Sequence, residues 1–190
     1  MLIWGISQGF HDAGLTVLDD DQILFASHSE RYSGIKHDEL LCKGIINAAL
    51  EYGYPDHIAY YEKPWLKRLR QIYTGEPKTP WSVDKILHSI LPDHILEGTG
   101  TKSYLHHHTH AAAGFQTSEY NDAIVVVADA IGEWDTTSIW YADYDSNGRV
   151  RYRKLWSRKY PHSIGLFYSA VTGAVGLRPM DEEYILMGMA

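Results

Sequence analysis

Two histidines and one aspartate near the middle of the chain have the residue types and the spacing of a metal site. His106 and His110 stand four residues apart in the segment LHHHTHAAAGF. On a helix that begins near His106 this separation is about one turn, so both imidazoles lie on one face. Paired histidines at this spacing bind one metal ion in the zincin helix. A third ligand is still required.

Asp129 is the natural third ligand. It follows the continuous apolar run 123–127, which predicts a buried strand, and it precedes a turn that contains Gly132. An acid at the carboxyl end of such a strand faces the crevice where open α/β sheets bind ligands. Two nitrogens and a carboxylate suit Fe(II), Zn or Mn alike. The competing interpretation is a solvated histidine cluster without a metal, because short spacing matches often arise by chance.

The composition is that of an ordinary globular protein with an acidic balance of charge. The 190 residues carry a formal net charge of -7, and this length suits one large domain or two small ones. The nearest basic run, 67–70, is short and typical of a solvated helix face. The charge therefore argues against nucleic acid as the main partner.

Cysteine usage and the N-terminus predict a cytoplasmic protein. Cys42 is the only cysteine, so no internal disulfide can form and a reducing compartment is expected. The start MLIWG lacks a basic region followed by a long apolar one, and no window reaches the length of a membrane span. We therefore expect neither a signal peptide nor a membrane partner.

The first half of the chain has the pattern of an antiparallel meander followed by helices. A polar turn with His11 and Asp12 separates the first two strands, and the tight turn 19–21 separates the next two. Prolines divide 62–100 into short helices such as 83–91, which indicates a variable surface elaboration. The other predicted elements are strands at 2–7, 15–18, 22–27, 57–61 and 103–105, a loop at 29–38 and a helix at 41–49.

The second half begins the same plan again. Its predicted elements are helices at 106–117, 164–175 and from 181 onward, and strands at 123–129, 136–144 and 150–156. A polar turn at 131–135 separates the first two strands, as the turn with His11 and Asp12 does in the first half. The order strand, acidic turn, strand, Asp-rich turn, strand, polar loop and helix thus occurs twice, which indicates an internal duplication.

A duplicated three-stranded meander followed by helices is the plan of the actin, sugar kinase and Hsp70 ATPase fold, an α/β class with ribonuclease H-like halves. In that fold two halves clamp a nucleotide, and their turns hold phosphate and metal with backbone N–H groups and carboxylates. A kinase of this fold is one alternative, but the histidine pair disfavours a magnesium-phosphate site. Two unrelated meanders in an α+β protein remain the alternative architecture.

Several segments together resemble one family, the carbamoyltransferases of the nodulation-factor, cephamycin and tobramycin type. The opening GISQGFHDAGLTVLDDDQILFASHSERYSGIKHD is similar to that family's start, with its His-Asp turn, Asp-Gly turn, Glu-Arg and Lys-His-Asp. LHHHTHAAAGF resembles its His-His-x-x-His-Ala-Ala segment, ADAIGEWDTTS its Asp-Gly-x-Gly-Glu turn, and EYILMGMA its Glu-x-Lys-x-Met-Gly-Leu-Ala segment. The resemblance spans the chain in order, and four separate matches are far more specific than one.

The resemblance implies a two-stage reaction. A YrdC-like domain uses ATP and carbamoyl phosphate to make carbamoyladenylate, and a Kae1-like domain of the actin-like fold transfers the carbamoyl group to a hydroxyl of a small-molecule acceptor. Residues 1–120 then form the first Kae1-like subdomain, with the elaboration at 62–100, and 121–190 form the start of the second. The second half is expected to be truncated at Ala190, with a further metal-binding aspartate and the YrdC-like domain beyond it. The isolated chain is therefore expected not to turn over.

The resemblance also implies roles for individual residues. His106, His110 and Asp129 are the implied metal ligands, with Fe(II) as the metal acting as a Lewis acid and template. His11 either donates a hydrogen bond to the leaving phosphate or takes the proton of the acceptor hydroxyl. The implied substrate- and nucleotide-binding residues are Asp12, Arg31, Lys36, Gly132 and Glu133. By spacing alone, the favoured interpretation is that His11 and Asp12 only shape a hairpin turn and that Lys36 is solvated.

Three residues depart from the family's pattern. Gly34 stands where a second arginine is usual, Ala130 where the turn has a glycine, and Ile185 where a lysine is found. The first change removes a charge that holds an anion, and the second restricts a backbone position where glycine reaches positive φ. These departures leave the acceptor open. A non-catalytic nucleotide- or metal-binding module of the same fold is the alternative function.

Overall fold

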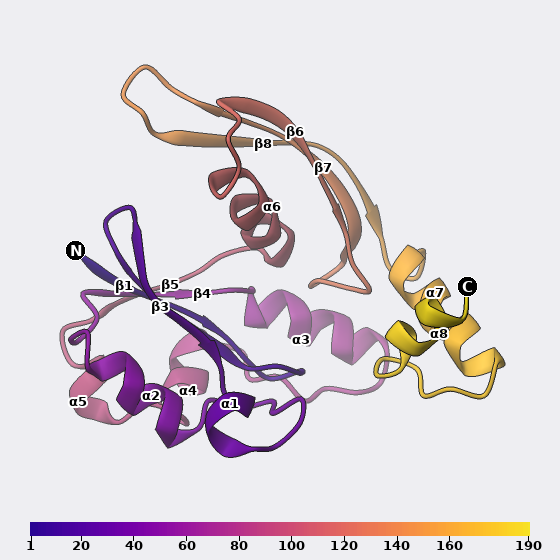
Figure 1. The fold of residues 1–190 in the computed structure, drawn as a ribbon, viewed down its shortest axis with the longest axis horizontal. Helices are drawn as coiled ribbons and strands as arrows, with labels where there is room; N and C mark the ends of the chain where they lie inside the picture. The colour runs from indigo at the N-terminus through magenta and orange to yellow at the C-terminus, as the bar shows by residue number, and fades with distance from the viewer. The chain divides into compact units, whose positions relative to one another are not determined.

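The computed structural model describes all 190 residues and has an α/β architecture. By its internal contacts the chain divides into two compact units, Met1–Leu105 and His106–Ala190. The strands are β1 (Leu2–Ser7), β2 (Gly14–Asp19), β3 (Gln22–His28), β4 (His57–Tyr60), β5 (Gly100–Ser103), β6 (Asp122–Ala128), β7 (Asp135–Tyr144) and β8 (Val150–Lys159). The helices are α1 (Glu30–Ser33), α2 (Lys43–Leu50), α3 (Pro64–Tyr73), α4 (Val83–Leu87), α5 (Asp93–Leu96), α6 (His106–Gln116), α7 (Ile164–Ala174) and α8 (Glu183–Met189), as labelled in Figure 1.

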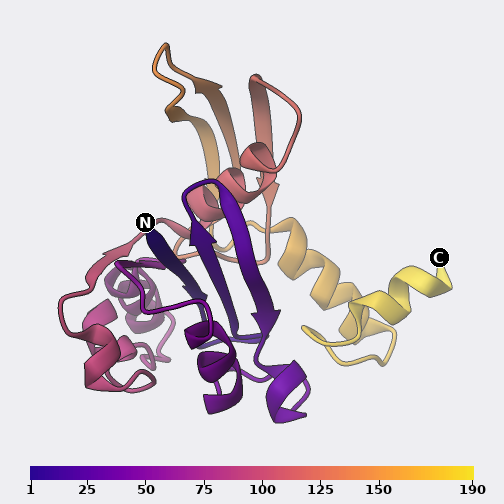
Figure 2. The same ribbon diagram turned by 60° about the vertical axis from the view of Figure 1, so that its left-hand side comes forward.

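The first unit contains a five-stranded mixed sheet in the order β3-β2-β1-β4-β5. β1, β2 and β3 form the predicted antiparallel meander, visible as the indigo and purple strands of Figure 2, and β4 and β5 extend the sheet parallel to β1. Trp4 and Ile6 on β1 lie opposite Val17 and Leu15 on β2, and all four are buried on one face. Asp20, with φ 51, forms the tight turn into β3.

Helices cover one face of this sheet (Figure 1). α2 packs on β2 and β3, and α4 packs on β5. The predicted apolar face of α2 is buried, as are the apolar side chains of α4 and α5, and together with the sheet they form one core. None of the helices in the chain combines the length and the apolar character needed to cross a membrane. The largest side chains of the core are Trp4, Tyr60, Ile6, Leu15, Ile45, Ile58, Leu87 and Ile95.

The second unit is built on an antiparallel sheet in the order β6-β7-β8, which confirms the predicted second meander. α6 lies along one face of this sheet and packs against β6 and β7 (Figure 1). α7 contacts β7 and α8. Ala111 of α6, Val127 and Trp140 form a small core, whereas Ile124 and Val126 on β6 remain exposed.

Two predicted elements in the first unit were wrong in kind or length. The polar segment 29–38, predicted as a loop, contains the short helix α1. The helix predicted at 83–91 ends at Leu87, since Ser89 donates a side-chain hydrogen bond to the carbonyl oxygen of Ile86 (2.6 Å) and the next residues form turns. Such a side-chain bond competes with the regular helical pattern.

The strand predicted at 103–105 lies earlier, as β5. Its parallel pairing with β4 begins where His57 faces Gly100 and ends at Ser103. A Cβ on Gly100 would lie 2.2 Å from the Nδ1 of His57, so a larger residue here would displace that exposed imidazole. The apolar residues after Ser103 predicted the wrong span, because strand limits here follow from backbone pairing between distant segments.

Candidate metal centre

The consecutive histidines at the start of α6 point in different directions, because successive side chains on a helix are rotated by about 100°. His106 and His110, one turn apart, share a face. His107 is buried against the sheet. His108 stacks on the ring of Trp140, with ring centroids 5.4 Å apart. One short sequence thus supplies two candidate ligands and two packing residues.

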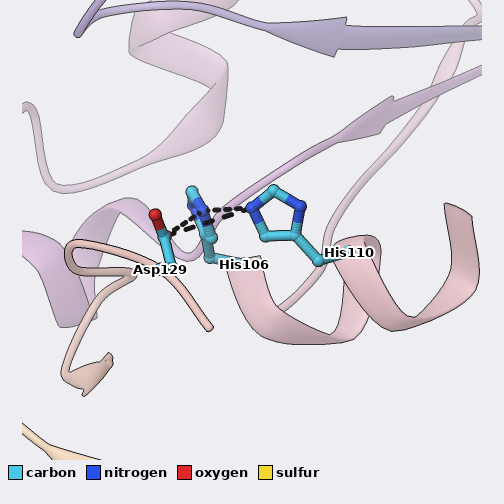
Figure 3. A group of neighbouring side chains, drawn as sticks. All are labelled: His106, His110 and Asp129. Atoms are coloured by element: carbon cyan, nitrogen blue, oxygen red, sulfur yellow. Dashed lines mark hydrogen bonds and ion pairs between the residues drawn. The ribbon is translucent and has the colours of Figure 1, made fainter. Parts of the chain in front are cut away.

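Asp129 meets the two ligand candidates, as Figure 3 shows. Its Oδ2 lies 3.0 Å from the Nε2 of His106 and 4.0 Å from the Nε2 of His110. The two Nε2 atoms lie 2.9 Å apart. All three potential ligand atoms fall within 4.8 Å of one another. The fold therefore brings together the three side chains that the sequence singled out.

The turn that carries Asp129 is held from several sides. Its Oδ1 accepts a hydrogen bond from the N–H of Ala130 (2.6 Å), while Oδ2 faces the histidines. The N–H of Asp129 donates to the carbonyl oxygen of Thr136 (2.9 Å). Ser163, the N-cap of α7, places its Oγ 3.1 and 2.7 Å from the carbonyl oxygens of Asp129 and Ala130 and accepts from the N–H of Leu166. The position of the carboxylate is thus determined by β7 and α7 as well as by β6.

Glu133 caps the N-terminus of α6. Its side chain is buried, and its two carboxylate oxygens accept a hydrogen bond from the N–H of His106 at 3.0 and 3.2 Å. A carboxylate in this place compensates for an unpaired helical N–H and for the helix dipole. Gly132 is also buried, and its N–H donates to the carbonyl oxygen of Asp135 (2.8 Å). Both residues thus help to position His106, and nucleotide binding by them stays a prediction.

His107 anchors the first turn of α6 to β7. Its Nδ1 lies 2.7 Å from the Oγ of Ser138, and the indole Nε1 of Trp140 donates to the same oxygen at 2.7 Å. Desolvation lowers the pKa of His107 to about 4, so the ring is neutral at physiological pH. This anchor sets the rotation of the helix and hence the direction of its neighbour His106.

The environment favours the ligating forms of two of the three side chains. Desolvation lowers the pKa of His110, and the neighbouring His106 lowers it further, against the opposing effect of Asp129. Desolvation would raise the pKa of Asp129, but the hydrogen bond and charge of His106 outweigh it and hold that pKa at about 2. At neutral pH the group therefore contains a neutral imidazole and an ionised carboxylate, the forms that bind metals.

The residues present fit a divalent metal. Separations of 2.9–4.0 Å allow all three atoms to lie ~2.0–2.2 Å from one ion, the range for imidazole nitrogen and carboxylate oxygen. The side chain of His110 is 53% exposed, so an ion here would be accessible to a substrate. The set of two nitrogens and one oxygen suits Fe(II), Zn and Mn.

Four of the predicted site residues lie in the first unit: two of them contact each other, and the other two are exposed on the surface. The Nδ1 of His11 lies 2.8 Å from the Oδ2 of Asp12, in the turn between β1 and β2. Arg31 on α1 and Lys36 after it are exposed. Contacts of these four residues with a substrate stay predictions.

Two departures from the family pattern have a structural explanation. Gly34 is the C-cap of α1 with φ 70, a left-handed conformation that favours glycine at a helix end. Ala130 does not adopt a positive φ, so alanine is accommodated in the Asp129 turn without backbone strain. The concern that Ala130 distorts this turn therefore does not hold.

Two residues that hold the site were overlooked in the sequence. Ser163 could have been found, because a serine directly before an apolar helical run is an N-cap signal. Gly165 permits the close approach of α7 to the turn, since a Cβ there would lie 2.6 Å from the backbone N and Cα of Ala130. No local pattern reveals such a contact between segments that are distant in the chain.

Comparison with known proteins identifies related chains. A family model described as "Carbamoyltransferase N-terminus" matches residues 82–190. The chain is 32% identical to the uncharacterized protein sll1178 of Synechocystis over 99% of its own length and 34% of that protein. It is 24% identical to the nodulation protein NolNO of Sinorhizobium fredii, over 95% of this chain and 27% of that protein.

A third relative matches the whole length of the chain. The uncharacterized protein MJ1051 of Methanocaldococcus jannaschii is 24% identical over 100% of this chain and 33% of its own length. The chain spans about a third of the length of these curated relatives, or somewhat less.

Proposed function

The chain belongs to the carbamoyltransferase N-terminus family, and from this premise we propose that it is the part of an O-carbamoyltransferase that binds carbamoyladenylate and a metal ion. The longer protein would transfer the carbamoyl group to a hydroxyl of a small-molecule acceptor. A YrdC-like domain of that protein would supply the adenylate from ATP and carbamoyl phosphate. The first unit opens with an antiparallel meander, and the second unit has one directly after its first helix. These two meanders support an actin-like, Kae1-like fold for this part.

The observation that carries the proposal is the group formed by His106, His110 and Asp129. Three ligand atoms from two segments converge, the carboxylate of Glu133 holds the backbone N–H of His106, and the N–H of Ala130 holds the carboxylate of Asp129. A surface cluster without a function would not need the buried cap of Glu133 or the anchor of His107. When bound, a divalent metal would supply Lewis-acid polarisation and orientation of the adenylate.

In the transfer step, residues of the first unit would act as the base and as the groups that stabilise negative charge. The acceptor oxygen attacks the carbamoyl carbon, the bond from that carbon to the phosphate oxygen breaks, and AMP leaves with the electron pair. The proton of the acceptor hydroxyl must go to a base, and His11 has the chemistry for that role. Arg31 and Lys36 would stabilise the negative charge that develops on the leaving phosphate. Both cationic side chains are exposed, as this role requires.

Metal content of the purified chain tests the proposal. Fe(II) is added under anaerobic conditions, and bound metal is measured by elemental analysis after desalting. We expect the wild-type chain to retain about one ion and a variant with His106→Ala and His110→Ala to lose it, because two of the three ligands are gone. Zn and Mn are tested in parallel, because the ligand set suits them as well.

The matched control removes two histidines elsewhere. His88 and His94 lie in the first unit, where the Nδ1 of His88 pairs with Asp93 (3.2 Å). The variant with His88→Ala and His94→Ala should retain metal as the wild type does. Equal retention by all three proteins, or none by the wild type, would reject the metal site and favour a binding module without a metal.

A further inference from the structure

A second group of histidines and carboxylates lies in the first unit, outside the metal centre. The carboxylate of Asp12 is shared between two imidazoles: its Oδ2 lies 2.8 Å from the Nδ1 of His11, and its Oδ1 lies 3.1 Å from the Nδ1 of His37. Glu30 accepts a hydrogen bond from the backbone N–H of His37 through Oε2 (3.0 Å). Side chains from three separate segments therefore meet around Asp12.

Backbone hydrogen bonds hold these segments together. The N–H of Gly9 donates to the carbonyl oxygen of Glu39 (2.8 Å), and the N–H of Ala13 donates to that of Asp38 (2.7 Å), so the 38–39 segment closes over both ends of the His11 turn. The N–H of Ser29, next to Glu30, donates to the carbonyl oxygen of Ala13 (2.7 Å). The group is thus built into the fold and is not a chance encounter of mobile side chains.

The two residues that make the bridge share an unusual backbone conformation. Asp12 has φ 49 and His37 has φ 56, both in the left-handed region. This region costs most residues about 1–2 kcal/mol, and aspartate and histidine are among those that occupy it more readily. The conformation aims the Asp12 carboxylate and the His37 imidazole at each other across 25 positions of the chain.

The hydrogen-bond chemistry determines where the ring hydrogens lie. Desolvation would raise the pKa of Asp12, but hydrogen bonds from His11 and His37 outweigh it and lower that pKa below its ordinary value. An ionised carboxylate only accepts, so both imidazoles must donate from Nδ1. In the neutral ring of His11 the lone pair is then on Nε2.

The same arrangement disfavours a second metal ion. Ligand atoms of Asp12, Glu30 and His37 lie within 4.8 Å of one another, as metal ligands would. Each carboxylate oxygen of Asp12, however, is paired with a different imidazole, and the Oε2 of Glu30 accepts from a backbone N–H, whereas in the metal centre one oxygen of Asp129 faces both histidines. A hydrogen-bonded relay therefore explains the geometry better than a cation site.

We propose that His37 and Glu30 are positioning residues, which act through Asp12 to hold His11 in the tautomer whose Nε2 accepts the proton of the acceptor hydroxyl. This role rests on the proposed carbamoyl transfer. In that step the O–H bond of the acceptor breaks and an N–H bond forms on Nε2 of His11, while AMP takes the electron pair of the broken carbon–oxygen bond. Glu30 contributes by fixing the backbone of His37, and Asp12 transmits the orientation.

The tautomer of His11 can be measured in the chain itself. Histidine is labelled with nitrogen-15, and spectra are recorded at a pH well above ~6.5, where imidazoles are neutral. We expect the Nδ1–H tautomer of His11 to dominate in the wild type. In His37→Gly we expect the fraction of this tautomer to fall to the fraction found in a reference peptide. In His37→Asn, whose amide nitrogen replaces Nδ1 as donor, we expect it to be restored.

Both substitutions at His37 suit its positive φ, because glycine and asparagine adopt the left-handed region readily, so loss of fold does not explain a difference between them. The control is His88→Gly, which removes another exposed histidine paired with an aspartate and should leave His11 unchanged. An unchanged His11 tautomer in His37→Gly would overturn the proposal.

Kinetics of the longer protein separate this proposal from the proposed function. If the protein transfers a carbamoyl group, His37→Gly should lower kcat at least about tenfold, with the KM for the acceptor unchanged, and His37→Asn should recover most of it. Equal kcat in His37→Gly and wild type would overturn the positioning role. Absence of transfer in the wild type itself would reject the proposed function, and the tautomer measurement would still decide whether His37 orients His11.

Discussion

At the scale of single residues, two aspartates each contact a pair of histidines. Asp129 faces the imidazoles of His106 and His110, and Asp12 bridges those of His11 and His37. In each case the carboxylate is held ionised, because hydrogen bonds from histidine outweigh the effect of desolvation. One group has the geometry of a candidate metal centre and the other that of a hydrogen-bonded bridge between two imidazoles.

The lowered pKa of Asp12 predicts a pH-dependent contribution to stability. Because its folded-state pKa lies below the ordinary value of 3.8, the ionised carboxyl stabilises the fold above 3.8, and this contribution is lost as the pH falls through the folded-state pKa. We expect Asp12→Asn to be less stable than the wild type near neutral pH and the difference to shrink in acid. Denaturant unfolding of both proteins at a series of pH values measures this.

Asparagine suits this test because it tolerates the φ of 49 and retains one acceptor oxygen for the histidines. Asp21→Asn, in the exposed turn between β2 and β3, serves as the control and should show no such trend. A stability difference between Asp12→Asn and the wild type that stays constant down to strongly acidic pH would contradict the prediction.

At the scale of elements, the turn after the first strand of each meander carries the aspartate of one of the two side-chain groups. Asp12 follows β1 and Asp129 follows β6, so the two units place an aspartate in corresponding turns. The surroundings differ, because the first turn is tied to the 38–39 segment and the second to the N-terminus of α7. Helix α7 must approach closely for Ser163 to reach the Asp129 turn.

Gly165→Ala should therefore damage the metal centre through the backbone. The new Cβ would lie 2.6 Å from the N and Cα of Ala130 and 2.9 Å from the carbonyl carbon of Asp129, and none of these atoms can move alone. We expect a loss of about 1–3 kcal/mol of stability and weaker metal retention. Thermal unfolding and the metal analysis described above check both effects.

The control for this prediction is Gly114→Ala in α6. A Cβ there would meet only Val125 Cγ1 at 3.9 Å, an ordinary contact. Alanine favours a helix over glycine by about 1 kcal/mol, so this variant should be as stable as the wild type or more stable. Equal stability and equal metal retention of the Gly165→Ala and Gly114→Ala variants would show that α7 does not constrain the Asp129 turn.

At the scale of the whole molecule, the two edges of the second sheet differ in character. β8 presents exposed basic side chains that pair within the sheet: Arg151 with Asp143, Lys154 with Asp135, and others with aromatic rings. Charged edge strands of this kind resist pairing with other chains. β6 forms the opposite edge, and its Ile124 and Val126 are 58% and 62% exposed.

The apolar edge of β6 predicts self-association of the isolated chain. Replacing Ile124 and Val126 by lysine should reduce it, because charged side chains on an edge strand oppose pairing between molecules. Sedimentation velocity over a range of protein concentrations measures the effect. Leu155→Lys on β8, 48% exposed in the wild type, is the control and should change association little. Equal association of all three proteins would exclude this edge as the cause.

Local patterns in the sequence were sufficient for much of the fold and for the candidate metal centre. Alternating apolar residues and Asp-rich turns predicted both meanders, and the spacing of His106 and His110 on a helix predicted their common face. Asp129 could be added because a strand that ends in an acid places it at the sheet's edge. These features depend on residues close together in the chain, where geometry follows from helix and strand periods.

Only the tertiary structure decided which distant groups surround these residues. The cap of α6 by Glu133, the approach of α7 through Gly165 and the bridge from Asp12 to His37 each join segments that share no sequence period. The parallel pairing of β4 and β5 likewise set the limits of β5. Such contacts arise from long-range packing and hydrogen bonding, which a one-dimensional pattern of apolar and polar residues does not encode.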